Sequence, residues 1–366
     1  MRVLVAPDSF GGTLTAVEAA EAIANGWRRQ SPEDTIETCP LSDGGPGFLD
    51  VLESGLGATR REVEVRGPLG EPTTAALLLR EDPDGVLTAY LETAQVIGLH
   101  LGAARALGAR RVVVGLGGSA TNDAGAGMLA ALAEDAGLTG STRFVERLTA
   151  GGGALGGVPA GDLTPLAALR ARWADVDIRI ASDVDSPLLG FHGASAGYAE
   201  QKGATAEQAQ TLDRSLGDFA AAATRAVGLP PRLSAEPGAG AAGGLGFGLM
   251  LIGGRRSAGT DAVLDAVGLT ERLGRQDLVV TGEGCFDWQS LRGKVIAGVA
   301  RTAREAGVPV VVIAGQVQVG RREMTAVGVD AAYPVARGAE EVAASLAAPA
   351  TRLSARSERV ARTWSR

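Results

Sequence analysis

The chain has 366 residues, of which 45% are hydrophobic, and a net charge of −7. At roughly 150 residues per domain this length predicts two domains, and the acidic balance argues against a nucleic-acid or anionic-membrane surface. No apolar run reaches the roughly 18 residues of a membrane-spanning helix, and the apolar run at the N-terminus is too short for a signal peptide. The two cysteines lie far apart without a CxxC pair, so we expect a reduced, cytoplasmic protein without a structural zinc site.

Strand-like and helix-like runs then alternate along the chain. The apolar run 3–6 predicts a strand, and the helical spacing after Thr15 predicts a helix with a Thr15–Glu18 capping box. A short helix is expected at 48–55, and one or two arginine-bearing surface helices are expected at 340–366. Further strand candidates are residues 35–39, 85–93, 111–116, 177–183, 277–284 and 308–315.

This alternation implies an α/β fold with mainly parallel sheets. The expected exception is a hairpin, because residues 61–67 and 73–80 alternate or run apolar around the turn 68–72. The two ends of the chain look like regular βα units, whereas the middle holds the hairpin and most of the glycine-rich loops. We therefore expect two α/β domains, one inserted into the other: a discontinuous domain of residues 1–65 plus 275–366, and an inserted domain of residues 66–274.

Several predicted strands end in a turn that carries a carboxylate. In open α/β sheets ligands bind outside the carboxyl ends of the strands, so these acids would face a common cleft. The competing interpretation for each acid is that it caps a helix or stabilises its own turn. The acids are Asp8, Asp43, Asp123, Asp183, Asp185, Glu283 and Asp287.

The loop 115–127, GLGGSATNDAGAG, is a candidate phosphate loop between a strand and a helix. Gly115, Gly117 and Ala120 match the dinucleotide pattern G-x-G-x-x-A, but the acid about 20 residues further on, Glu134, lies in the predicted helix rather than at the end of the next strand. The strict P-loop pattern does not occur in the chain. What remains is a glycine turn whose backbone amides can face an anion at a helix N-terminus.

That loop contains no lysine or arginine, so the positive charge for a polyphosphate must come from elsewhere. A metal ion held by nearby carboxylates would supply it, and kinases use Mg²⁺ in this way. Of the 35 basic residues only Lys202 and Lys294 are lysines. Each is either a cation of the site or a residue of a solvated face.

The motifs together resemble those of the bacterial glycerate kinases of the glycerate 2-kinase family. They occur in the family's order and cover nearly the whole chain. The runs are APDSFGGTLTA (6–16), PLSDGGPG (40–47), GLGGSATNDAGAGML (115–129), ASDVDSPLLG (181–190), GASAGYAEQKGA (193–204), PGAGAAGGLGFGL (237–249), DLVVTGEGCFDWQS (277–290) and RGKVIAGVA (292–300).

The resemblance implies phosphorylation of D-glycerate by ATP with Mg²⁺, giving 2-phosphoglycerate in a cleft between two α/β domains. The chain departs from the family pattern at three charged positions: a lysine, a glutamate and an arginine are replaced by Gly12, Pro46 and Cys285. Smaller departures are Ser186, Ala199 and Glu200. If the missing lysine normally meets phosphate, its loss removes a charge-assisted contact.

Phosphoryl transfer needs a clamp on the phosphates, a metal ion and an oriented hydroxyl group. For catalysis we expect Asp183 or Asp185 as the base or the orienting group, with Lys202 as a cation. The expected metal ligands are Asp8, Asp43 and Glu283. The expected substrate- or phosphate-binding residues are Ser9, Ser42, Gly117, Gly118, Ser119, Thr121, Asn122 and Lys294.

Two alternatives stay open at this point. The chain could act on another small sugar acid, or it could be a non-catalytic binding protein that kept the fold without the chemistry. The missing lysine, glutamate and arginine favour the second alternative, whereas the intact loop motifs argue against it. The partners expected are a small hydroxy acid and a nucleotide, and a homodimer is left open.

Overall fold

The computed structural model describes residues 1–67, 70–94, 98–138 and 142–365 of the chain. The chain divides into two compact units, unit 1 with residues 1–43, 50–57 and 259–366, and unit 2 with residues 44–49 and 58–258. The predicted α/β class with mostly parallel sheets is confirmed. The sequence-based boundaries at residues 65 and 275 stay a prediction about independently folding domains.

The strands are β1 (Arg2–Val5), β2 (Thr35–Thr38), β3 (Thr59–Arg66), β4 (Pro72–Glu81), β5 (Leu87–Glu92), β6 (Arg111–Gly115), β7 (Asp177–Ala181), β8 (Arg255–Ser257), β9 (Leu278–Thr281), β10 (Cys285–Phe286), β11 (Val310–Ala314), β12 (Gln316–Val317) and β13 (Ala331–Pro334). The α-helices are α1 (Ala16–Gln30), α2 (Phe48–Leu56), α3 (Gly98–Ala106), α4 (Ala126–Asp135), α5 (Thr142–Thr149), α6 (Pro165–Arg172), α7 (Ala194–Tyr198), α8 (Ala206–Ala226), α9 (Ala241–Leu251), α10 (Gly259–Ala266), α11 (Leu269–Leu273), α12 (Val295–Ala306), α13 (Arg321–Ala326), α14 (Ala339–Ala347) and α15 (Pro349–Trp364). Each predicted strand and helix has its counterpart in this series.

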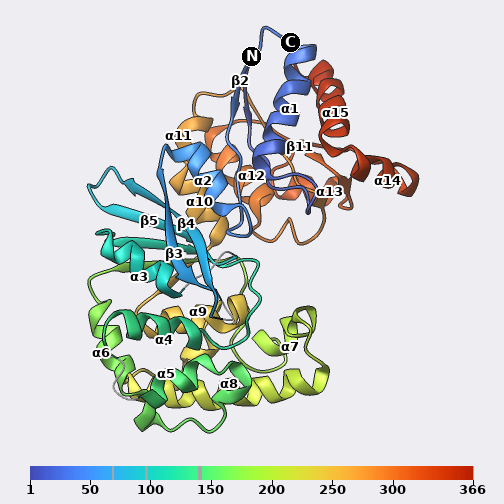
Figure 1. Ribbon diagram of the computed structural model, residues 1–366. Coiled ribbons are helices and arrows are strands. Elements are labelled where there is room, and N and C mark those ends of the chain that lie inside the picture. The colour runs from blue at the N-terminus through green and yellow to red at the C-terminus, as the bar shows by residue number, and fades with distance from the viewer. Residues whose placement is uncertain (68–69, 95–97, 139–141, 366) are drawn as a thin grey trace. The chain divides into compact units, whose positions relative to one another are not determined.

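Unit 1 is built on a parallel sheet of five strands in the order β13-β11-β9-β1-β2. Helices α1 and α15 lie on one side of this sheet, and α10, α11 and α12 lie on the other (Figure 1). Because both faces are covered, the inner strands β1, β9 and β11 are apolar at nearly every position; residues 310–314, for example, read VVVIA and are all buried. This explains why apolar runs predicted these three strands.

The helices of unit 1 follow from local signals in the sequence. The predicted capping box at α1 is confirmed: the Glu18 amide donates to the Thr15 hydroxyl at 3.2 Å, and the Thr15 amide donates to the Glu18 carboxylate at 2.8 Å. Where one or two C-terminal helices were expected there are two, α14 and α15, and α15 buries Leu353 and Val360 in the core of the unit. No helix within the described parts of the chain combines the length and the apolar character needed to cross a membrane.

The strand order of unit 1 contains one reversal. Taken in chain order its five strands are arranged 2-1-3-4-5, so the connections change direction between β1 and β9. Loops that leave the carboxyl ends of strands on the two sides of such a point diverge and leave a crevice, the usual place of a ligand in this architecture. The loop after β1 carries Asp8, and the loop after β9 carries Glu283.

Unit 2 contains a six-stranded sheet in the order β3-β4-β5-β6-β7-β8. Strands β3, β4 and β5 pair antiparallel, which confirms the predicted hairpin, although residues 68–69 of its turn lie outside the described residues. Strands β5 to β8 are parallel. The loops that follow β6 and β7 therefore leave the sheet at the same end, the carboxyl ends of its parallel strands. These loops contain the 117–122 segment, Asp183 and Asp185.

Candidate active site

A cavity of about 490 Å³ lies at the β1–β9 reversal in unit 1. Its polar lining includes Asp8 and Ser9 from the loop after β1, Asp43, Glu283 from the loop after β9, and Lys294. The hydrogen bond from the Asp8 amide to the Gly282 carbonyl, at 2.8 Å, joins the two loops directly. The fold thus brings together all three acids predicted as metal ligands and one of the two predicted cations.

Two carboxyl groups of this cavity, those of Asp8 and Glu283, have raised pKa values. Burial, followed by the charge of Asp43, raises the pKa of Asp8 from 3.8 to about 7, although the Ser9 amide donates to its Oδ1 at 2.6 Å and opposes the shift. Burial likewise raises the pKa of Glu283 to about 7, against a hydrogen bond from Ser290 and the charge of Lys294. The cavity therefore gathers carboxyl groups that repel one another when they are ionised, a charge distribution that favours a bound cation.

The donor chemistry of the cavity fits Mg²⁺. Glu283 is only 9% exposed, and within the described part of the chain its Oε1 atom is buried with no hydrogen-bond partner. Carboxylate oxygens are the protein ligands that Mg²⁺ takes. Among the residues that the structure describes, no three His, Cys, Asp or Glu side chains form a group that could hold a metal ion by themselves. Asp8, Asp43 and Glu283 would therefore act with water and phosphate oxygens, as is usual for Mg²⁺ in kinases.

Lys294 stands at the start of helix α12. It is the residue that precedes the first helical position, and its side chain makes no capping hydrogen bond. The amides of the first turn of a helix and the helix dipole favour an anion at this end. The cavity thus combines a helix N-terminus and a lysine, which suit phosphate, with carboxylates, which suit a metal ion.

Of the departures from the family pattern, Cys285 lines this cavity, and Gly12 lies between its lining residues Gly11 and Thr13. Burial, followed by the charge of Asp287, raises the pKa of the Cys285 thiol. Gly12 is exposed and has φ of +77°, and a side chain added there would meet no heavy atom within 4 Å. The space for a lysine is open, but the left-handed backbone disfavours any residue with a side chain. Ser42 is buried and does not line the cavity.

In unit 2 the 117–122 loop is held by Lys202. Its ammonium group donates to the Ser119 hydroxyl at 2.9 Å and to the Thr121 carbonyl at 2.7 Å. Burial lowers the pKa of Lys202, against the charge of Asp123. Lys202, which is distant in the sequence, therefore holds the loop by two hydrogen bonds and places a positive charge beside it.

The same loop is braced by two glycine-rich segments. A side chain at Gly243 would place its Cβ 1.9 Å from the Thr121 carbonyl oxygen, and one at Gly117 would place it 2.4 Å from the Cα atom of Gly45. Only glycine allows these close approaches of backbone to backbone. Asn122 donates to the Ser195 hydroxyl at 3.0 Å, and its Oδ1 atom is buried with no partner in the described parts of the chain.

The Asp123 carboxylate is engaged within its own loop. Its carboxylate accepts the amides of Gly125 at 3.0 Å and Gly127 at 2.9 Å, at the start of α4. The competing interpretation, helix capping, is therefore correct for this acid. These two amides are also unavailable to an external anion, so the expected contribution of the α4 N-terminus to phosphate binding is reduced.

Asp183 and Asp185 lie in the loop after β7. The Asp185 side chain is 77% exposed, and its Oδ1 atom forms an ion pair of 2.5 Å with Nη2 of Arg256 on β8. The sequence did not indicate Arg256, because β8 is three residues long and carries no motif. Only the pairing of β7 with β8 places the two side chains together. Arg256 is thus the ion-pair partner of the Asp185 carboxylate.

We expect replacement of Lys202 by methionine to lower kcat/KM about tenfold and to loosen the 117–122 loop. Methionine keeps the length of the side chain but removes both hydrogen bonds, each worth roughly 1.5–3 kcal/mol for a charged donor. Hydrogen exchange followed by mass spectrometry should show faster amide exchange at residues 117–123, with arginine at this position restoring part of the protection. Unchanged exchange in the methionine variant would contradict the role given to Lys202.

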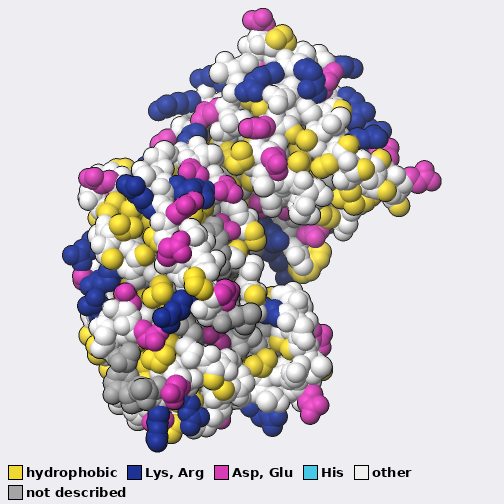
Figure 2. All heavy atoms as spheres, in the orientation of Figure 1, with side chains coloured by type: hydrophobic (Ala, Val, Ile, Leu, Met, Phe, Trp, Pro, Cys, Tyr) yellow, Lys and Arg dark blue, Asp and Glu magenta, His cyan; other side chains and the backbone are white. Residues whose placement is uncertain are grey.

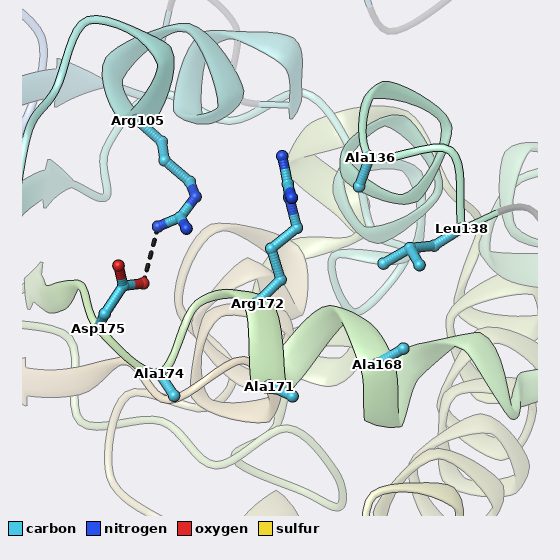
Figure 3. Close-up of a pocket in the computed structure, with 8 residues that line it drawn as sticks. All are labelled: Arg105, Ala136, Leu138, Ala168, Ala171, Arg172, Ala174 and Asp175. Atoms are coloured by element: carbon cyan, nitrogen blue, oxygen red, sulfur yellow. Dashed lines mark hydrogen bonds and ion pairs between the residues drawn. The ribbon is translucent and has the colours of Figure 1, made fainter.

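A second hollow, of about 670 Å³, lies on the surface of unit 2 (Figure 3). The side chains of Arg105 and Asp175 point toward one another and form an ion pair of 2.8 Å, while Arg172 extends from α6 beside them. The Arg105 guanidinium also lies 5.6 Å from the centre of the Trp173 ring. None of the predicted site residues lines this hollow.

Comparisons with known proteins agree with the motifs. The family model described as the glycerate kinase family matches residues 3–107 and 101–365. The chain is 37% identical to a glycerate kinase of Bacillus subtilis over 364 residues, which cover 93% of this chain and 91% of the relative. It is 35% identical to the glycerate 2-kinase of Escherichia coli over 356 residues, which cover 92% and 90%.

A solved structure supports the same relationship. The crystal structure of a protein described as a glycerate kinase 2, from Salmonella typhimurium LT2, superposes with a TM-score of 0.76. The match covers 99% of this chain and 98% of that chain, at 31% sequence identity. Sequence and fold thus point to one and the same family over the full length of the chain.

Proposed function

The chain belongs to the glycerate kinase family, and from this premise we propose that it transfers the γ-phosphoryl group of ATP to D-glycerate, with 2-phosphoglycerate as the product. The observation that carries the proposal is the cavity at the β1–β9 reversal. It supplies Asp8, Asp43 and Glu283 for a metal-bound polyphosphate and Lys294 at a helix N-terminus for a phosphoryl oxygen.

The mechanism that we propose is mainly positioning and electrostatic stabilisation. When bound, Mg²⁺ would neutralise charge that develops on the transferring phosphoryl group. Asp8 and Glu283 would hold the metal ion as carboxylates, which requires both groups to lose their protons. Lys294 donates to a phosphate oxygen, and the Ser9 amide and hydroxyl lie next to Asp8 in the same cavity.

We assign the acid substrate to the loops of unit 2. Ser119, Thr121 and the amides of the 117–122 segment would hold its carboxylate or hydroxyl groups, with the charge of Lys202 beside them. Asp185, oriented by Arg256, would accept a hydrogen bond from the attacking hydroxyl. A small polyhydroxy acid suits loops that are rich in serine, threonine and asparagine.

The choice of 2-phosphoglycerate is supported by the name of one relative, the glycerate 2-kinase of Escherichia coli. ATP as the donor and Mg²⁺ as the metal are supported by the carboxylates, the lysine and the helix N-terminus of the unit 1 cavity. The free cysteines, Cys39 and Cys285, agree with a cytoplasmic location.

The test is a phosphoryl-transfer assay with ATP, Mg²⁺ and D-glycerate, with ³¹P NMR of the product. We expect ADP and 2-phosphoglycerate in equal amounts, and no turnover in the presence of a chelator. A panel of other small hydroxy acids tests the acid specificity. Nucleotide binding without turnover on any acid would instead support the non-catalytic alternative, which the replacements at Gly12, Pro46 and Cys285 favour.

A further inference from the structure

The unit 1 cavity has an apolar wall that metal and phosphate binding do not use. The wall residues are Phe10, Leu14, Val335, Leu346, Pro349 and Leu353. Phe10, Leu14 and Leu353 belong to the hydrophobic core of the unit, against which Val335 packs. Four of the six residues thus belong to the core or pack against it, while Leu346 lies on α14 and Pro349 begins α15.

Helix α14 contributes an exposed leucine to this wall. Leu346 has a large hydrophobic side chain and is nevertheless 59% exposed, and no residue of α14 is buried. Hydrophobic side chains gather on the surface over the C-terminal helices of the unit (Figure 2). The cavity thus has apolar side chains on one side and charged groups on the other, a lining that suits a ligand with one apolar and one charged part.

We propose that this apolar wall, with Leu346 at its edge, receives the base of the nucleotide while the carboxylates and Lys294 face its phosphates. The inference rests on the proposed function and adds the part of the nucleotide that each side of the cavity binds. A nucleoside polyphosphate joins a planar, largely apolar base to a charged chain. These two parts match the lining of the cavity, which has apolar residues such as Phe10 and Leu14 and charged residues such as Asp8 and Lys294.

The other reactant does not match the wall. Glycerate has three carbons, each with a polar substituent, and would neither fill a cavity of about 490 Å³ nor cover apolar side chains. A second copy of the chain bound to α14 would cover Leu346, but it would not account for the other apolar residues that line the cavity. Self-association is therefore a separate outcome of the test.

The experiment compares a nucleotide with its phosphate part alone. Binding of ADP and of inorganic pyrophosphate, each with Mg²⁺, is measured by calorimetry on the full chain and on Leu346→Asp. We expect the Kd of ADP to rise about tenfold, since a charge replaces an apolar contact, and the Kd of pyrophosphate to stay unchanged. Leu346→Met should bind ADP like the original chain. Leu107→Asp, a change at another exposed leucine that lies in unit 2, is the matched control.

The outcomes separate this inference from the proposed function. Equal ADP binding by the original chain and Leu346→Asp, with kinase activity intact, would overturn the inference alone. Absence of ADP binding by the original chain would overturn the proposed function and the inference with it. Equal weakening of ADP and pyrophosphate by Leu346→Asp, or a loss of dimers on sedimentation without a change in the Kd of ADP, would also contradict the role given to Leu346.

Discussion

Replacing Asp8 by asparagine is expected to lower kcat/KM for glycerate phosphorylation roughly a hundred- to a thousandfold, the usual cost of losing one group that stabilises transition-state charge. Asparagine has the same shape as aspartate but lacks the negative charge that we propose for binding the metal ion of the nucleotide. Steady-state kinetics at saturating Mg²⁺ measures the effect. The matched control is Asp265→Asn, the same change at an exposed position on α10, which should leave activity unchanged.

The same substitution should make the free protein more stable. The pKa of Asp8 is 3.8 in its ordinary state and about 7 in the folded chain, so the folded state binds the proton more tightly. The contribution of Asp8 to the free energy of unfolding therefore falls as the pH rises from about 4 to about 7, and the full penalty is present above pH 7. Asparagine carries no such charge.

Urea unfolding without Mg²⁺ tests this second effect. At pH 8 we expect Asp8→Asn to be more stable than the original chain by on the order of 1–2 kcal/mol, and at pH 4 the difference should vanish. A loss of activity together with a gain in stability would identify Asp8 as a group whose charge serves function. A loss of both would indicate that Asp8 holds the β1 loop in place instead.

The elements of the fold could be predicted because each depends on local pattern. Buried parallel strands such as 310–314 read as apolar runs, and the Thr15–Glu18 pair marks the start of a helix. The order of the strands could not be predicted in this way, since it depends on contacts between distant segments. The reversal between β1 and β9, which places Asp8 beside Glu283, is visible only in the folded chain.

The site shows the same division. The sequence indicated which acids end a strand, but all of them had the same local appearance, and only the structure separates Asp123, which caps α4, from Asp8, which lines a cavity. Arg256 and Leu346 were missed because a lone arginine on a short strand and a leucine in a surface helix carry no pattern of their own. The expected cleft shared by two domains stays a prediction.

Replacement of Lys294 by methionine is the second substitution with a large expected effect. We expect kcat/KM for ATP to fall about a hundredfold, since a charged hydrogen bond to a buried phosphate oxygen contributes roughly 1.5–3 kcal/mol. Arginine at position 294 keeps the charge and should recover part of the activity. Lys202→Met is the natural comparison, because Lys202 is the only other lysine of the chain and its charge acts on Asp123 instead.

The pH profile distinguishes a phosphate ligand from a residue that merely supports the fold. The charge of Lys294 lowers the pKa of both Asp8 and Glu283, so its removal raises both values. Activity that requires these carboxylates in their ionised form increases with pH, and kcat/KM reports the pKa values of the free enzyme. The rising limb of the profile should therefore move to higher pH in Lys294→Met and stay in place in Lys202→Met. If kcat/KM fell a hundredfold while the rising limb of the pH profile stayed in place, Lys294 would not interact electrostatically with the two carboxylates. The assignment of metal and phosphate to one cavity would then be wrong.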